Sequence, residues 1–134
     1  MENDVILNKI TVIERCHTRI KDVYAGDPNN LTDFTKQDSI VLNIQRACEA
    51  CIYLAMHVSA EKKFGLPQKS REAFELLHTN NVITEETVTN MKSMVGFRNI
   101  AVHDYQAINA KILEKIIEHH LDDFISFTKQ ILAY

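Results

Sequence analysis

The sequence predicts an all-α protein, an antiparallel bundle of four to five helices in a single domain that spans residues 1–134. Three glycines and two prolines leave few positions at which the chain can turn. Aromatic residues make up only 7% of the chain and tryptophan is absent, which argues against a strand-rich fold. Apolar residues also recur every three or four positions, the spacing of one face of a helix.

We expect the first helix to run from about Asp4 to Tyr24, with Ile10, Ile13 and Ile20 on its apolar face. The segment 25–30 combines Gly, Pro and Asn and ends this helix.

The second and longest helix is expected from about Thr35 to Phe64. It is ended by the sequence Gly65-Leu66-Pro67. A short third helix follows from Ser70 to about Thr79, and the two asparagines at 80 and 81 break it.

Thr84 is a good N-cap for a fourth helix, and Glu85 and Glu86 place negative charge in the first turn, where the helix dipole favours it. This helix leads into the segment 98–105. Its apolar face consists of Val88, Met91, Met94 and Val95.

A last helix is expected from about Asn109 to the C-terminus, which completes the bundle. The residues that it is expected to bury are Ile112, Ile116, Ile117, Leu121, Phe124 and Phe127.

The cysteine content and hydropathy predict a cytoplasmic protein without a membrane segment. Cys16, Cys48 and Cys51 are odd in number and no secretory leader precedes them, which favours a reducing compartment. No apolar run approaches the ~20 residues of a membrane helix. The net charge is −3, so we expect any binding of nucleic acid to depend on a local basic cleft rather than on a basic face of the molecule.

Two candidate metal sites are better explained by structure, so we expect no metal and no cofactor. The Cys48-x-x-Cys51 pair lies on the apolar face of the second helix, without a second Cys or His pair at zinc-site spacing, and is expected to pack in the core. The adjacent His119 and His120 point about 100° apart on a helix, which favours a solvated face over a metal site.

The segment 97–105 carries the polar cluster that stands out in the chain. Asn99 and His103 are four residues apart and share one helix face, whereas Arg98 and Tyr105 share another. Arg98 and His103 lie roughly 140° apart on a regular helix, so they cannot easily converge on one phosphate. Either the helix unwinds near Val102, or a second copy of the chain completes the site.

The pattern Arg-x4-His-x-Tyr, present as Arg98, His103 and Tyr105 with Asn99 beside the arginine, resembles the signature of the HEPN superfamily and, within it, of the HepT toxins. Roughly the last three-fifths of the chain is similar to that family, whereas the first helix is similar only in character. The similar segments are the Leu66-Pro67 break, the helix Arg71–Leu77, the acid-rich start 83–86 and the lead-in Met94–Phe97.

The resemblance implies a HEPN-domain homodimer that acts as a metal-independent endoribonuclease toxin, with its site at the dimer interface. RNA supplies its own nucleophile, the 2′-hydroxyl. His103 would then move protons and Arg98 would stabilise charge on the phosphate. Asn99, one turn from His103, would orient the imidazole or bind the substrate. The expected substrate is an RNA such as tRNA or mRNA.

The resemblance also implies a partner and a means of control. In HepT-like systems an MntA-like nucleotidyltransferase antitoxin silences the toxin by transferring AMP to the motif tyrosine, here Tyr105. The added phosphodiester would bring negative charge to the place where the substrate phosphate binds.

Other interpretations remain open from the residues alone. The chain can be a non-catalytic HEPN subunit that positions a substrate for a minimal nucleotidyltransferase, or a purely structural dimer. Arg98 and His103 can form a structural network, and Tyr105 can be an interface residue. The second helix can supply a further polar contact, such as Asp38 or Arg46.

Overall fold

The computed structural model describes residues 2–134, with side chains from residue 4 onward, and confirms the all-α class. None of the helices in this range is both long and apolar enough to cross a membrane. The described helices are α1 (Glu2–Tyr24), α2 (Phe34–Glu61), α3 (Ser70–Thr79), α4 (Glu85–His103), α5 (Ala110–His119) and α6 (Asp123–Ala133), with two 3₁₀ turns, η1 (Pro28–Thr32) and η2 (Tyr105–Ala107).

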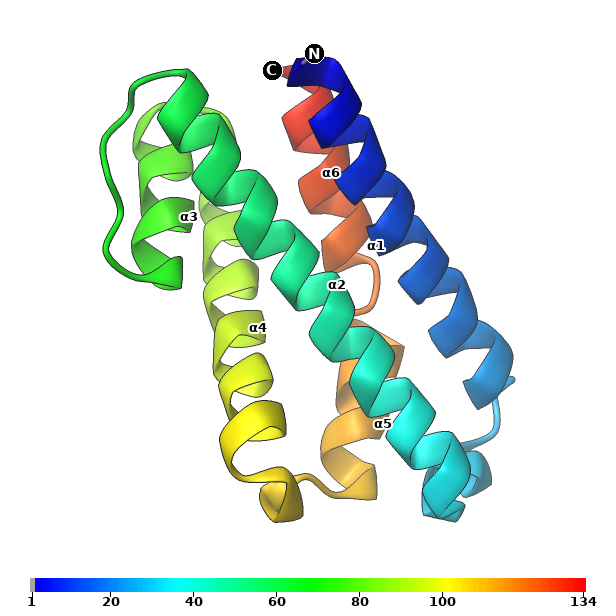
Figure 1. Cartoon of the computed structure of the whole chain (residues 1–134). Helices are drawn as coiled ribbons and strands as arrows, with labels where there is room; N and C mark the ends of the chain where they lie inside the picture. The colour runs from blue at the N-terminus through cyan, green and yellow to red at the C-terminus, as the bar shows by residue number, and fades with distance from the viewer. Residues whose placement is uncertain (1) are drawn as a thin grey trace.

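Helix α2 crosses the middle of the bundle and contacts most of the other elements (Figure 1). Its most extensive contact is with α1, and it also packs on α3, α4 and α6. In Figure 1, α1 and α4 run downward whereas α2, α5 and α6 run upward. The neighbouring pairs α1–α2, α2–α4 and α4–α6 are therefore antiparallel, as the sequence predicts.

One continuous core runs along α2, and the apolar stripes read from the sequence form it. Phe74 of α3 and Phe127 of α6 meet edge to face, with ring centroids 5.5 Å apart. Burial of each such side chain stabilises the fold by about 1.5–3 kcal/mol. The largest fully buried side chains include Ile13, Ile20, Ile40, Ile44, Leu54, Leu77, Met91, Leu113 and Phe124.

The three cysteines are buried in this core as free thiols. Cys16 lies on α1, and Cys48 and Cys51 lie on the face of α2 that points inward. Burial raises the pKa of each thiol above its usual value. This agrees with the expected packing role.

The predicted last helix is in fact two helices, so the described chain has six helices rather than four or five. The chain breaks at His120, where the backbone leaves the helical region (φ −129°, ψ −3°). The break lets α5 pack on η1 while α6 packs on α1, α2 and α4. It also shifts the buried face of α5: Leu113 is buried and Ile112, expected inside, is exposed.

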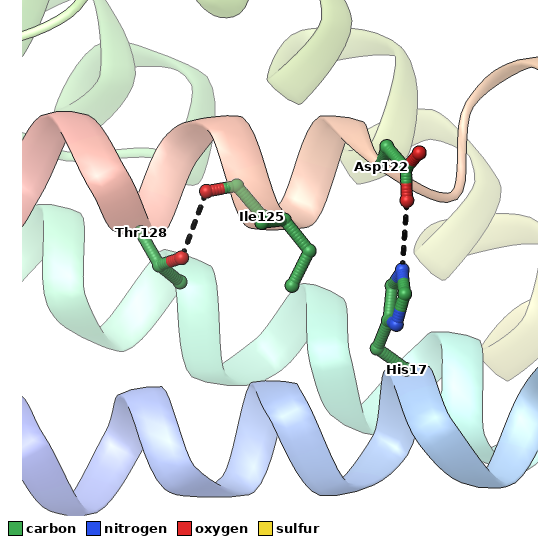
Figure 2. Close-up of polar contacts among 4 residues, drawn as sticks. All are labelled: His17, Asp122, Ile125 and Thr128. Carbon is green, nitrogen blue, oxygen red and sulfur yellow. Dashed lines mark hydrogen bonds and ion pairs between the residues drawn. The ribbon is translucent and has the colours of Figure 1, made fainter.

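Two histidine–aspartate pairs hold the turn between α5 and α6. Nε2 of His17 on α1 lies 2.9 Å from Oδ1 of Asp122 (Figure 2), which ties the turn to α1. Nδ1 of His120 lies 3.0 Å from Oδ2 of Asp123. Basic residues at the end of one helix followed by acidic residues at the start of the next indicate a helix break. The prediction that His119 and His120 lie on one solvated helix face did not use this signal.

Helix α2 ends at Glu61, three residues before the predicted end. Lys63 adopts a left-handed conformation (φ 58°). The backbone N–H of Lys63 donates to Ala60 O (3.2 Å) and that of Phe64 donates to Ser59 O (2.9 Å), the hydrogen-bond pattern of a Schellman cap. The chain has thus left the helix before it reaches Gly65.

Candidate active site

Helix α4 carries the predicted site residues at its C-terminal end. Thr84 caps its N-terminus as predicted, since its hydroxyl oxygen accepts a hydrogen bond from the N–H of Thr87 at 3.2 Å. The helix continues without interruption through His103 and ends at Asp104, where φ is −150°. The possibility that it unwinds near Val102 is therefore wrong for the single chain.

Arg98 is held by an acidic residue on the neighbouring helix. Its Nη2 lies 3.1 Å and its Nε 3.2 Å from the same carboxylate oxygen of Glu49 on α2. The side chains of Arg98 and Glu49 are 32% and 40% exposed, so both remain in contact with solvent. The pair fixes the direction of the guanidinium and leaves further N–H groups for a ligand.

Asn99 lies on the arginine's side of the site. Its amide oxygen accepts a hydrogen bond of 3.4 Å from Nη1 of Arg98. Arg98 is thus bound by acceptors from both α2 and its own helix.

His103 is the last residue of α4 and is exposed. Because α4 is regular up to this point, His103 points roughly 140° away from Arg98 around the helix axis. Within one chain the structure therefore does not bring the two predicted catalytic residues together.

Tyr105 begins the turn η2, just beyond α4, and its hydroxyl donates a hydrogen bond to the carboxylate of Asp38 near the start of α2. The tyrosine is 40% exposed. Desolvation, together with the negative charge and hydrogen bond of Asp38, raises the pKa of the phenol to about 12.

These two contacts lie on one surface of the bundle, which we call the α2–α4 face. It consists of Asp38, Leu42 and Glu49 of α2 with Arg98 and Val102 of α4, residues that repeat at helical spacing. Leu42 and Val102 are exposed apolar side chains that lie between the two polar pairs. An apolar strip flanked by polar groups is typical of a protein interface.

Sequence reasoning named Asp38 as a possible polar contact, and the structure confirms this contact with Tyr105. The other named residue, Arg46, is exposed on α2. Sequence reasoning missed Glu49, although a signal was present. Glu49 interrupts an otherwise apolar run of α2, and a carboxylate at a half-buried position requires a partner.

Comparison with known proteins gives consistent matches over nearly the whole chain. The family model of the HepT-like ribonucleases matches residues 13–131. The mRNA nuclease HepT of Shewanella oneidensis is 50% identical over 131 residues, which cover 98% of each chain.

Among solved structures, a tri-AMPylated Shewanella oneidensis HEPN toxin in complex with MNT antitoxin matches with a TM-score of 0.92 and 51% identity, covering 98% of each chain. A toxin–antitoxin structure with AMP-PNP matches with a TM-score of 0.92 and 50% identity, covering 98% of this chain and 99% of that one.

Proposed function

Because this chain belongs to the HepT-like ribonuclease family, we propose that its catalytic pair is Arg98 and His103 and that two copies of the chain join to complete each site. The family assignment makes the protein an endoribonuclease and the toxin of a toxin–antitoxin pair. The residues that act, the assembly and the partner are the proposal.

The observation that carries the two-copy site is the unbroken helix α4. It keeps Arg98 and His103 on different sides of one chain, so they can face one phosphate only across an interface. The exposed Leu42 and Val102 of the α2–α4 face supply apolar surface for such a contact. A two-fold axis beside Val102, which lies between Arg98 and His103 around the axis of α4, would set Arg98 of one copy near His103 of the other.

The proposed reaction uses the RNA's own 2′-hydroxyl as nucleophile. Its oxygen attacks the neighbouring phosphorus, the bond to the 5′-oxygen of the next nucleotide breaks, and a 2′,3′-cyclic phosphate remains. His103 transfers the protons, and Arg98, aimed by Glu49 and Asn99, stabilises the charge that builds on the phosphate oxygens. Since the nucleophile belongs to the substrate, this scheme requires no metal.

The proposed substrate is messenger RNA. A relative that shares half of its residues with this chain is an mRNA nuclease, and the two match over nearly their full lengths. The proposed place of action is the cytoplasm, where mRNA is found and where three unbridged thiols are stable.

The proposed antitoxin is an MntA-like nucleotidyltransferase that transfers AMP to Tyr105. Similar solved structures include a toxin AMPylated in complex with its MNT antitoxin and a toxin–antitoxin structure with an ATP analogue. Tyr105 is exposed and lies on the arginine's side of α4, so the added phosphodiester would occupy and repel the substrate phosphate near Arg98.

The test is cleavage of mRNA by the purified chain in excess EDTA. Arg98→Ala and His103→Ala should each lower the rate by at least ~10²-fold, because each removes a positioned charge or proton carrier. The products should end in 2′,3′-cyclic phosphate.

Two exposed residues of the same types serve as matched controls, Arg19→Ala on α1 and His119→Ala on α5, and should cut as the parent does. If both site variants cut RNA at the parental rate, the assignment of the catalytic pair is wrong.

A further inference from the structure

The hydrogen bond between Tyr105 and Asp38 joins two elements that each have local hydrogen bonds of their own. Asp38 lies in the first turns of α2, which Asp33 caps by accepting the N–H of Lys36 at 3.1 Å. The turn η2 that carries Tyr105 is closed by the N–H of Ile108, which donates to Tyr105 O at 3.0 Å. These contacts set the backbone positions of Asp38 and Tyr105, from which the carboxylate accepts the phenolic hydrogen bond.

The phenol of Tyr105 is a poor nucleophile unless its proton is removed. A tyrosine with an ordinary pKa of about 10 is already almost fully protonated at neutral pH. In this chain the pKa is raised to about 12, which lowers the phenolate fraction further. Transfer of AMP to this oxygen therefore requires a base that takes the proton during the step.

We propose that Asp38 is that base, so that the toxin supplies a catalytic residue for its own AMPylation. This inference rests on the proposed transfer of AMP to Tyr105 and assigns the group that makes it possible. The Tyr105 oxygen forms a bond to the α-phosphorus of ATP, and the bond from that phosphorus to the oxygen bridging to the β-phosphorus breaks. Pyrophosphate leaves, and the phenolic proton moves to the Asp38 carboxylate and then to solvent.

The surroundings of the phenol favour Asp38 over other carboxylates. Among the described residues, Asp38 is the charged group whose effect on the Tyr105 phenol is resolved, and it accepts the phenolic hydrogen bond. Asp104 is next to Tyr105 in the chain and exposed, but the phenolic hydrogen bond goes to Asp38. Asp38 and Tyr105 are both exposed in the single chain. In the proposed dimer the site has to stay open to RNA, and the same opening admits a nucleotidyltransferase carrying ATP.

The test measures the rate of AMP addition by the cognate nucleotidyltransferase, with ATP and Mg²⁺, from the intact mass of the chain. Asp38→Asn keeps an acceptor oxygen of the same size but is not a base, and should slow the transfer about 10²-fold. Asp104→Asn removes a neighbouring charge and should stay within about threefold of the parent, because that carboxylate does not receive the phenolic proton. Asp38→Glu, which keeps a base, should retain more of the rate than Asp38→Asn.

Two further readouts separate a base from a residue that only positions the tyrosine. The Asp38→Asn rate should rise about tenfold per pH unit above neutrality, since the proton must then leave by itself, while the parental rate stays flat. A fluorinated tyrosine at position 105, whose phenol is more acidic, should restore the Asp38→Asn rate more than it changes the parent. A positioning residue would give neither the pH slope nor the rescue.

The inference is overturned if Asp38→Asn is modified at the parental rate, or if its deficit responds neither to pH nor to the fluorinated tyrosine. Because Asp38 is exposed, the variant should fold, which far-UV circular dichroism checks. A parent that gains no AMP at Tyr105 would overturn the proposed modification itself, a different outcome from a modified parent and an equally modified variant.

Discussion

At the scale of single residues, the arginine proposed to bind phosphate is already bound to a carboxylate. Glu49 holds the guanidinium through two hydrogen bonds, and its negative charge also repels the phosphate that Arg98 has to bind. Both side chains are partly exposed, so the pair adds little to stability, at most about 1 kcal/mol. The pair mainly sets the direction of the Arg98 guanidinium, and Glu49 competes with the substrate phosphate for it.

Glu49→Gln should therefore separate binding from catalysis. Loss of the charge should strengthen RNA binding about fivefold. This corresponds to about 1 kcal/mol, the repulsion between two unit charges at contact distance in water. The single-turnover rate should fall, because a neutral amide aims the guanidinium less firmly. Binding is measured in a His103→Ala background, with Glu14→Gln on α1 as the control for a lost surface charge. Weaker RNA binding by Glu49→Gln would contradict this account of the pair.

The site could be predicted from sequence only where it lies within one segment. Arg98, Asn99, His103 and Tyr105 were predicted from their spacing and from family resemblance. The family is confirmed, whereas the roles of these four residues stay predictions. The pairing of Glu49 with Arg98 was not identified, because 49 residues separate the two and only the packing of α2 on α4 brings them together. The bond between Asp38 and Tyr105 spans 67 residues and was foreseen only as an open possibility.

At the scale of helices, the apolar periodicity predicted where each helix lies but not every point where one ends. The start near Thr84 was correct, because the threonine side chain caps the helix there. The start at Ser70 was also correct, although no side chain caps α3. The break at His120 was missed, because its local signal, histidines followed by aspartates, was interpreted as a solvated face. The different partners of α5 and α6 and the contact of Asp122 with α1 are tertiary contacts. Periodicity continues across such a break and cannot reveal it.

The end of α2 makes a prediction of its own, because Lys63 occupies a position that glycine normally fills. A residue with a Cβ is strained at its φ of 58°. Lys63→Gly should raise the free energy of unfolding by about 0.5–1 kcal/mol, measured by urea denaturation. Lys62→Gly is the matched control: its φ of −90° suits any residue, so glycine there should destabilise the fold. A loss of stability in Lys63→Gly would mean that the cap is not strained.

At the scale of the whole molecule, the two-copy site can be tested by mixing inactive variants. Arg98→Ala and His103→Ala chains, allowed to exchange subunits, should form mixed dimers that contain one intact site. Random pairing makes about half of the dimers mixed, so about a quarter of the parental activity should return in RNA cleavage assays.

The control for this mixing experiment pairs Arg98→Ala with the Arg98→Ala/His103→Ala double variant, which cannot rebuild a site and should stay inactive. If native mass spectrometry detects mixed dimers of the two single variants but no activity returns, each site lies within one chain.

The unbroken helix α4 has a consequence for how the activity depends on dose. If one chain cannot assemble a site, cleavage below the dissociation constant of the dimer follows the square of the chain concentration. A log–log plot of initial rate against concentration should then have a slope near two at low concentration and near one at high concentration. A slope of one throughout, at concentrations where native mass spectrometry detects monomers, would contradict it. When a cell doubles its volume without making new chain, the concentration of the unmodified chain halves and the rate of RNA cleavage per unit volume falls about fourfold, so growth itself relieves the intoxication.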